Sequence, residues 1–273
     1  MPKVFDPEDI IYECLGKRAK RGFNPAAFSY ICPFTSVDCT KRSTADKSVP
    51  YPVCSLTPKT SDMRVAICPK RFYDIDILKD VVEHAWLGEK PSNPVMVSEV
   101  QMEDFGNVDF VIADVSGDNT ISQFISCELQ AIDITGSVRP AYEALVENRS
   151  ITEKFAYGFN WKNVSKRYVT QLISKGYFHH HWKSRIVAVI QDVVYDYFKS
   201  EADFPIFPHE NNPQANIVFM VYGFESQDGE EDKIVLKKVE GTHHSNLQNA
   251  ILYKNAPDRE LFIEKIKSRF PES

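Results

Sequence analysis

The chain of 273 residues has a mass of 31.2 kDa, with 43% hydrophobic residues, 26% charged residues and a formal net charge of −6. A chain of this size can bury a substantial core, and its 11 glycines and 16 prolines exclude a collagen-like or linker-like composition. The acidic balance argues against a nonspecific coat for DNA. It does not exclude an enzyme that acts on DNA, because such an enzyme needs only local positive charge.

The hydropathy of the chain predicts a cytoplasmic protein without a membrane segment. No stretch approaches the run of roughly 18 apolar residues that marks a membrane helix. The first ten residues, MPKVFDPEDI, carry acids where a signal peptide has a basic start and then an apolar stretch. In a reducing compartment the six cysteines are not expected to form disulfides, so a cluster of them indicates metal binding or catalysis.

Hydrophobic periodicity predicts a mixed α/β chain. Apolar side chains at helical spacing indicate helices, and β-branched or alternating runs indicate strands. In chain order, the expected elements are an irregular basic segment at 17–47, a helix at 74–87 that stops at Gly88, strands at 94–100, 109–114 and 123–133, a helix after Ser137, a helix at 161–175, β-branched segments at 184–198 and 216–225, and a closing helix at 258–270.

Turn and capping residues refine this order. The SGDN turn at 116–119 predicts a hairpin between the second and third strands. Asn160 and Gly176 are the expected N-cap and C-cap of the helix between them, and 216–225 is the expected central strand. The predicted fold is a mixed central sheet flanked by helices, from about residue 95 onward, behind an irregular N-terminal region held by a metal. The expected division is residues 1–73 and residues 74–273.

Four cysteines in one window suggest the metal site. They are Cys32, Cys39, Cys54 and Cys68. A tetrahedral thiolate site can organise a segment too poor in apolar periodicity to fold alone, and four protein ligands would make its role structural. The spacing lacks tight CxxC pairs, so buried free cysteines are the alternative, and zinc and a single iron both fit four sulfurs. Cys14 is a possible substitute ligand, and Cys127 is expected to be an ordinary buried thiol.

Acidic and amide side chains on the predicted hairpin suggest a second metal site. Glu128 and Gln130 share one face of their strand, about 7 Å apart. The hairpin would bring Asp109 opposite Glu128, and Glu99 could add an acid from a third strand. Converging carboxylates can hold Mg²⁺, which polarises a scissile phosphate and lowers the pKa of a bound water. The alternative is an ordinary, partly exposed pair of strand residues.

The position of Gln130 matters for this chemistry. Nucleases with an acid, a gap and then Glu-x-Lys have a lysine at that place. Glutamine can orient water or phosphate through its amide, but it cannot act as a base or supply positive charge. The metal-activated water would then carry more of the activation.

Several segments together resemble the NotI-type restriction endonucleases. The segments are CPFTSVDC, YPVCSL, ICPKRF, VDFVIAD and CELQAIDITGS, and they cover about residues 30–200. The family is similar to the wider Asp/Glu-x-Lys nucleases but carries Glu-x-Gln, and it holds one metal ion in a four-cysteine site near the amino terminus. The resemblance implies a restriction-endonuclease-like core.

Carried over position by position, the resemblance implies roles for individual residues. Asp109 and Glu128 would bind the catalytic Mg²⁺, Gln130 would take the place of the usual lysine, and Glu99 would be a further acid. The four cysteines would be structural ligands, with iron favoured over zinc by the resemblance. The chain is shorter than the longest members, which leaves the extent of its recognition loops open.

A basic segment is the expected DNA-binding face. Residues 154–185 carry seven Lys and Arg and no acid, which suits phosphate neutralisation. The expected DNA contacts are Lys162, Lys166, Arg167 and Gln171. Phosphate contacts would position the duplex, and arginine or glutamine in the major groove would read bases. A solvated basic helix is the alternative, and the acidic segment 225–240 is expected to face solvent away from DNA.

The histidine runs are assigned no metal from the sequence. Three adjacent side chains at 179–181 cannot all point one way on a helix or strand, and His243 with His244 is treated likewise.

The leading hypothesis is a Mg²⁺-dependent type II restriction endonuclease that cuts both strands of a palindromic, GC-rich site as a homodimer, with a cognate DNA methyltransferase encoded nearby. The GC-rich target is implied by the resemblance alone. Two alternatives are a Mg²⁺-dependent DNA nuclease without a fixed sequence and a DNA-binding protein of the same fold that has lost catalysis.

Overall fold

A six-stranded mixed sheet forms the centre of the computed structural model, which describes residues 4–42, 47–48, 50–58, 62–152, 154–226, 232–253 and 257–270. Its strands are β5 (Pro94–Gln101), β6 (Asn107–Val115), β7 (Ile121–Gln130), β10 (Arg185–Gln191), β11 (Ile217–Glu225) and β12 (Lys233–Thr242). The order is β12-β11-β10-β7-β6-β5. β10 runs parallel to both β7 and β11, and the other pairs are antiparallel. The predicted mixed sheet and the predicted hairpin are confirmed.

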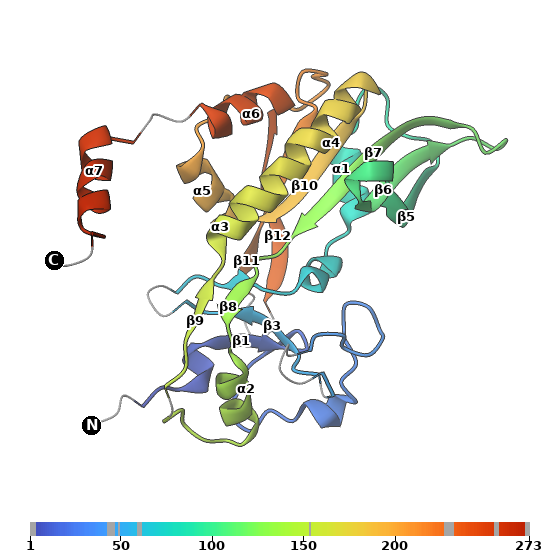
Figure 1. Ribbon diagram of the computed structural model, residues 1–273. Coiled ribbons are helices and arrows are strands. Elements are labelled where there is room, and N and C mark those ends of the chain that lie inside the picture. The colour runs from blue at the N-terminus through green and yellow to red at the C-terminus, as the bar shows by residue number, and fades with distance from the viewer. Residues whose placement is uncertain are drawn as a thin grey trace.

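Helices cover the two faces of this sheet. Figure 1 shows the long helix α4 (Val169–His181) lying across one face, with α5 (Asp192–Glu201) and α6 (His244–Leu252) beside it. Alternate β10 residues Ile186 and Ala188 share an apolar cluster with Leu172 of α4. The intervening Val187 shares the other cluster with Val81 of α1 (Ile77–His84). β10 is buried along its whole length because both of its faces are covered.

A smaller unit lies below the central sheet in Figure 1. Its four strands are β1 (Ile11–Cys14), β2 (Lys17–Arg18), β3 (Val53–Leu56) and β4 (Val65–Ala66), in the order β2-β1-β3-β4. Between β2 and β3 the described residues hold only the short 3-10 helix Pro25–Phe28 and isolated bridges, so this segment is irregular as predicted. A second ribbon, β8 (Ile134–Gly136) and β9 (Tyr157–Phe159), flanks α2 (Arg139–Val146).

The division at residue 73 stays a prediction. The small sheet ends at Ala66 and the central sheet begins at Pro94, so a change of sheet brackets that point. One apolar cluster nevertheless joins Ile11 and Val53 to Leu145 and Leu172.

Two predicted helix boundaries are wrong. The helix expected at 161–175 begins as α3 (Trp161–Asn163), passes through a π-helical turn (Val164–Tyr168) and continues as α4 to His181. Gly176 therefore lies inside the helix and does not cap it. A Cβ at Gly176 would lie 3.0 Å from Ile217 and 3.1 Å from the Cβ of His244, so the glycine serves close packing. The helix expected at 74–87 is shorter and ends at His84, ahead of Gly88.

The remaining predicted elements are found with modest changes. The third strand ends at Gln130 instead of residue 133, and the segment at 184–198 divides into β10 and α5. β11 lies between β10 and β12, which confirms it as an inner strand. The closing helix is α7 (Arg259–Lys267), which lies apart from the sheet in Figure 1. No helix among the described residues is long and apolar enough to cross a membrane.

Candidate active site

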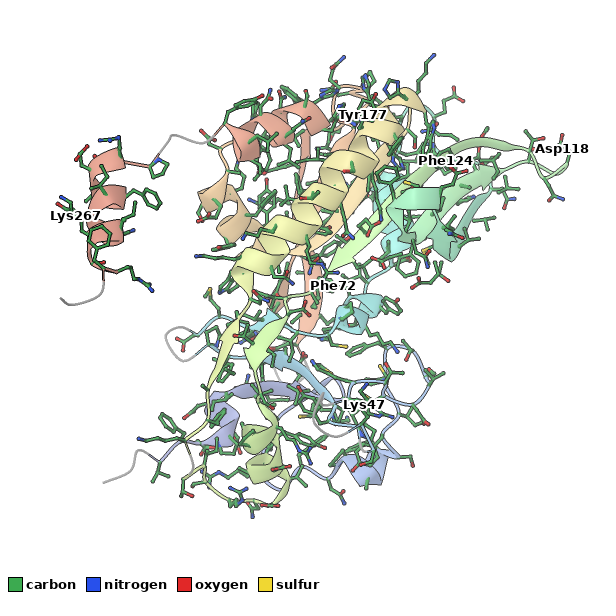
Figure 2. The ribbon with its side chains drawn as sticks, in the orientation of Figure 1. Lys47, Phe72, Asp118, Phe124, Tyr177 and Lys267 are labelled. Atoms are coloured by element: carbon green, nitrogen blue, oxygen red, sulfur yellow. The ribbon has the colours of Figure 1, made fainter. Side chains whose placement is uncertain are left out.

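The β6–β7 hairpin brings the predicted acids together. Figure 2 shows its tip, marked by Asp118, projecting away from the body of the protein. The backbone ladder pairs Phe110 with Cys127, next to Asp109 and Glu128. Next to that pair, the Asp109 carboxylate accepts a hydrogen bond from the backbone N–H of Leu129, at 2.7 Å. Asp109 is thus fixed beside Glu128, with its second oxygen left for another partner.

Glu99 stands at an irregular point of the neighbouring strand. The β5–β6 ladder pairs Ser98 with Phe110 and Val100 with Val108, so Glu99 and Asp109 lie between two regular pairs. Glu99 has φ of +54°, a backbone conformation that is uncommon for a residue with a side chain. Its carboxylate accepts a hydrogen bond from the Asn107 amide at 3.3 Å and is exposed to solvent.

Burial and mutual repulsion raise the pKa values of Asp109 and Glu128. The pKa of Glu128 is raised to about 7, chiefly by burial; Lys175 lowers it, and the charges of Asp109 and Glu99 contribute to the rise. Burial also raises the pKa of Asp109, with Glu99 adding to the shift. Two carboxylates that are costly to ionise together form a site where a divalent cation would relieve the repulsion.

Lys175 is a candidate functional residue that the sequence did not single out. It comes from α4, is 1% exposed, and forms an ion pair with the Oε1 atom of Glu128. Its ammonium also donates to the backbone carbonyl of Asn107, at 2.8 Å. A buried ammonium held by a carboxylate and a carbonyl places positive charge next to the acids, where Gln130 can place none. The only signal in the sequence was a lysine on the inward face of a basic helix.

Further contacts hold α4 against β7. The Tyr168 hydroxyl donates to the backbone carbonyl of Glu128, at 3.0 Å. The ring of His179, one turn beyond Lys175, contacts the Ser126 hydroxyl at 2.8 Å and the Lys175 carbonyl at 2.8 Å. Burial lowers the pKa of His179 to about 4, so this histidine is a neutral core residue at physiological pH. The contacts of Tyr168 with Glu128 and of His179 with Ser126 fix the helix register that directs Lys175 at Glu128.

Gln130 is the last residue of β7 and is half-buried. Its amide donates to the neighbouring backbone carbonyl of Ala131, so its side chain is turned along the chain. It shares the face of Glu128, because Ala188 and Ile190 of β10 pair with Glu128 and Gln130 in register. The structure thus brings Asp109 and Glu128 together, with Glu99 near enough to affect the pKa of both and Gln130 at the margin. One oxygen from each of the three acids does not lie within 4.8 Å of the others, so Glu99 is not part of a closed ligand group in this geometry.

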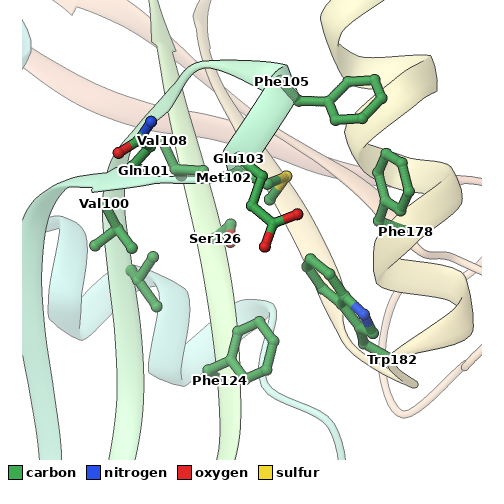
Figure 3. Close-up of a pocket in the computed structure, with 11 residues that line it drawn as sticks. Val100, Gln101, Met102, Glu103, Phe105, Val108, Phe124, Ser126, Phe178 and Trp182 are labelled. Atoms are coloured by element: carbon green, nitrogen blue, oxygen red, sulfur yellow. The ribbon is translucent and has the colours of Figure 1, made fainter.

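A cavity of about 420 Å³ adjoins this site on the α4 side of the sheet. Figure 3 shows Phe124 and Ser126 of β7 on one side and Phe178 and Trp182 on the other, with the carboxylate of Glu103 among them. Asp109, Glu128 and Glu99 do not line the cavity. The lining of this cavity is mainly apolar and aromatic. We therefore place the candidate chemistry at Asp109 and Glu128, near the start of β6 and the end of β7, and not in this cavity.

The four predicted cysteines converge on another cavity. Cys32, Cys39, Cys54 and Cys68 all line a space of about 200 Å³. Among the described residues, no three of their sulfur atoms lie within 4.8 Å of one another, so a closed metal site is not formed in this geometry. Burial raises the pKa of Cys54 to about 12 and also raises that of Cys39.

Polar groups around the cysteine cavity suit bound thiolates. The backbone N–H groups of Gly16 and Lys41 are directed at Cys54 and Cys39, and each lowers the pKa of the thiol that it contacts. The Lys41 ammonium donates to the backbone carbonyl of Ile67 at 3.1 Å and interacts electrostatically with the cysteines. A metal site at these cysteines stays a prediction.

The basic segment is only partly a surface. Lys162, Lys166, Arg167 and Gln171 are exposed, on α3, the π-helical turn and α4. Lys175 and Arg185 are buried instead, and Arg185 donates to the carbonyls of Ala85 and Asn212. Two of the seven basic residues therefore serve the interior. Contact of the four exposed residues with DNA stays a prediction.

A mixed sheet flanked by helices, with acids on an antiparallel hairpin, is a restriction-endonuclease-like core, the class of nuclease that the fold and this site define. The family model described as Restriction endonuclease NotI matches residues 24–234. The chain belongs to this family, which confirms the resemblance seen in its sequence and makes the protein one of a family of phosphodiester hydrolases. Comparisons with curated proteins and with solved structures found no match.

Proposed function

We propose that this protein is a Mg²⁺-dependent type II restriction endonuclease. The observation that carries the proposal is the convergence of Asp109, Glu128 and the buried Lys175 at one sheet edge, in a chain that matches the NotI family over most of its length. The proposed reaction is hydrolysis of both strands of double-stranded DNA at a fixed sequence.

The donor set at the sheet edge suits Mg²⁺. Hard oxygen ligands from one or two carboxylates, completed by water and phosphate, are typical for this ion. Asp109 and Glu128 each have one oxygen engaged within the protein, by Leu129 and Lys175, and one that could face an ion. When bound, Mg²⁺ would polarise the scissile phosphate and lower the pKa of the attacking water. Glu99, exposed beside them, is the proposed further acid.

The residues of the chain would divide the remaining tasks. Lys175 would keep Glu128 ionised and in place, because its ammonium lowers the pKa that burial raises. Asp109 is held by the N–H of Leu129. Gln130 would orient water or a phosphate oxygen through its amide, since it cannot take up a proton. The positive charge that other nucleases place two residues after the glutamate would thus come from a helix.

The exposed basic residues before and within α4 are the proposed DNA interface. Lys162, Lys166 and Arg167 would contact phosphates, and Gln171 would reach a base edge. A homodimer would place one acid site on each strand, and its two-fold symmetry would match a palindrome. The GC-rich character of the site is proposed from the family resemblance.

The four cysteines are the proposed structural metal ligands. They surround one cavity and receive two backbone N–H groups, which suits thiolates bound to iron or zinc. The metal would hold the irregular segment between β2 and β3. We also propose a cytoplasmic location, where DNA is accessible, and a methyltransferase encoded nearby that protects the host site.

Digestion of unmethylated phage DNA by purified protein with Mg²⁺ tests this function. A fixed set of fragments is expected, with ends that map to one palindromic sequence. A smear would favour a nuclease without sequence preference. Absence of cleavage on several unmethylated substrates, with DNA binding retained, would favour the catalytically inactive DNA-binding protein.

A further inference from the structure

Three histidines from two distant segments meet beside the end of α4. His180 lies in the last turn of α4, His243 precedes α6, and His244 is the first residue of α6. One ring nitrogen from each lies within 4.8 Å of the others, and this is the one such group of potential metal ligands found among the described residues. Figure 2 marks this region by Tyr177, on α4 next to α6.

Buried packing brings the two segments into contact. The side-chain amide of Asn216 donates to the Gly176 carbonyl at 2.5 Å, and its oxygen accepts the backbone N–H of His244 at 3.0 Å. Asn216 is 1% exposed, so these bonds are sheltered from water. The absent side chain of Gly176 leaves room for His244 beside the helix. The position of the histidines is therefore set by core contacts and not by a mobile loop.

One pair of ring nitrogens has the spacing expected of two ligands on a tetrahedral metal. His180 Nδ1 and His243 Nε2 are 3.3 Å apart. Two nitrogens bound to Zn²⁺ at about 2.0–2.1 Å in tetrahedral geometry are separated by roughly 3.3 Å. The other nitrogen of His243, Nδ1, is 2.7 Å from the Ser245 hydroxyl. With Nε2 on a metal, Nδ1 would carry the proton and donate it to this hydroxyl, as the second nitrogen of a metal-binding histidine typically does.

Two of the three histidines, His243 and His244, are adjacent in the sequence, and both belong to the group. His243 and His244 lie side by side, with ring centroids 4.2 Å apart, because the chain turns from strand to helix between them. Adjacent side chains diverge along a helix or a strand, but at such a turn both rings can lie on one side.

We propose that His180, His243 and His244 form a site for a divalent transition-metal ion of the Zn²⁺ class, with its fourth position open to water. The ion would join the last turn of α4 to the first turn of α6. Imidazole ligands select this class over Mg²⁺ or Ca²⁺, which prefer oxygen. The site is separate from the acids at β6 and β7 and does not depend on the proposed nuclease function.

Calorimetric titration with ZnCl₂ at pH 7.5 tests the site, on untagged full-length protein from which only loosely bound metal has been removed by dialysis. The informative variants are His180→Ala, which changes an exposed residue, and His243→Asn, which retains a side chain able to cap α6. His181→Ala is the matched control, because it removes an exposed imidazole of the same run that lies outside the trio. Any zinc bound by the cysteines is common to all four proteins.

Wild type and His181→Ala are expected to bind one more Zn²⁺ per chain than His180→Ala and His243→Asn. At saturating zinc their melting temperature should rise on the order of 5 °C more than that of the two site variants. Equal stoichiometry and equal thermal shifts in all four proteins would overturn the proposal, as would a site filled only at millimolar zinc. In that case the three rings would be a hydrogen-bonded group of imidazoles.

Discussion

At the scale of single residues, the candidate active site depends on how Glu128 is ionised. Its pKa lies near 7 because burial disfavours charge, and Lys175 is the group that opposes this shift. A carboxylate in this state binds a cation only after losing its proton. The requirement for Mg²⁺ should therefore increase as the pH falls through 7, by roughly tenfold per pH unit if one proton is displaced.

Replacing Lys175 tests its role. Lys175→Met removes the positive charge that lowers the pKa of Glu128, so the pH midpoint for cleavage should move upward, and the rate at pH 7.5 should fall about 100-fold. Cleavage rates measured from pH 6 to pH 9 check both effects. Lys90→Met, at an exposed lysine outside the site, should match wild type. An unshifted pH profile for Lys175→Met would show that the lysine only fills space.

The acids could be predicted from the sequence, but the lysine could not. Asp109 and Glu128 lie on a hairpin, where the turn and the strand alternation decide which side chains meet. Lys175 is 47 residues from Glu128, and its approach depends on how α4 packs across the sheet. The grouping of His180 with His243 and His244 could not be predicted either, because only tertiary packing brings their two segments together.

At the scale of elements, α4 connects most of the features described above. It carries Lys175 and His179 towards β7 and presents Gln171 and His180 to solvent. Gly176 was expected to end the helix, because glycine is common just past a C-terminus. The helix continues because that glycine allows a close approach to Ile217 of β11. The C-cap rule for glycine failed here because close packing of the helix against the sheet requires glycine too.

A large side chain at position 176 should separate α4 from the sheet. Gly176→Leu would meet Ile217 and His244, so we expect a loss of roughly 1–3 kcal/mol in the free energy of unfolding. Cleavage should fall as well, because Lys175 would move from Glu128. Urea denaturation and cleavage assays measure these effects. Gly117→Ala, where an added Cβ meets nothing within 4 Å, should be neutral in both, and a neutral Gly176→Leu would contradict the packing argument.

The cysteine segment offers a second test at this scale. Cys39→Ser should remove the proposed structural metal and lower the free energy of unfolding by more than about 3 kcal/mol, because binding a structural metal contributes directly to folding. Elemental analysis and denaturation measure the two effects. Cys127→Ala, at a buried thiol on β7 outside the cavity, should retain the metal. Equal metal content in the two variants would rule out the cysteine site.

At the scale of the whole molecule, the cysteine segment and the acids are physically connected. The 3-10 helix Pro69–Asp74 starts directly after Cys68 and carries Tyr73. Burial raises the pKa of Tyr73, and the charges of Asp109, Glu99 and Cys68 add to that shift, so this residue lies near both sites. A well-ordered cysteine segment should therefore help to position the candidate active site at β6 and β7.

The homodimer is a prediction at this scale. Light scattering after size-exclusion chromatography should give about twice the chain mass of 31.2 kDa. A duplex with one target site should be cut in both strands without a lasting nicked intermediate, because each subunit would act on one strand. A stable monomer that accumulates nicked DNA would contradict this prediction.

The most direct test of the account compares wild type with Glu128→Gln on unmethylated DNA that carries a mapped site, with Mg²⁺. Glutamine keeps the size of the side chain but cannot ionise. We predict that the variant binds the DNA as tightly as wild type in fluorescence anisotropy and cleaves it at least about 10³-fold more slowly. Cleavage by Glu128→Gln at the wild-type rate would contradict the assignment of the active site to the edge of β6 and β7.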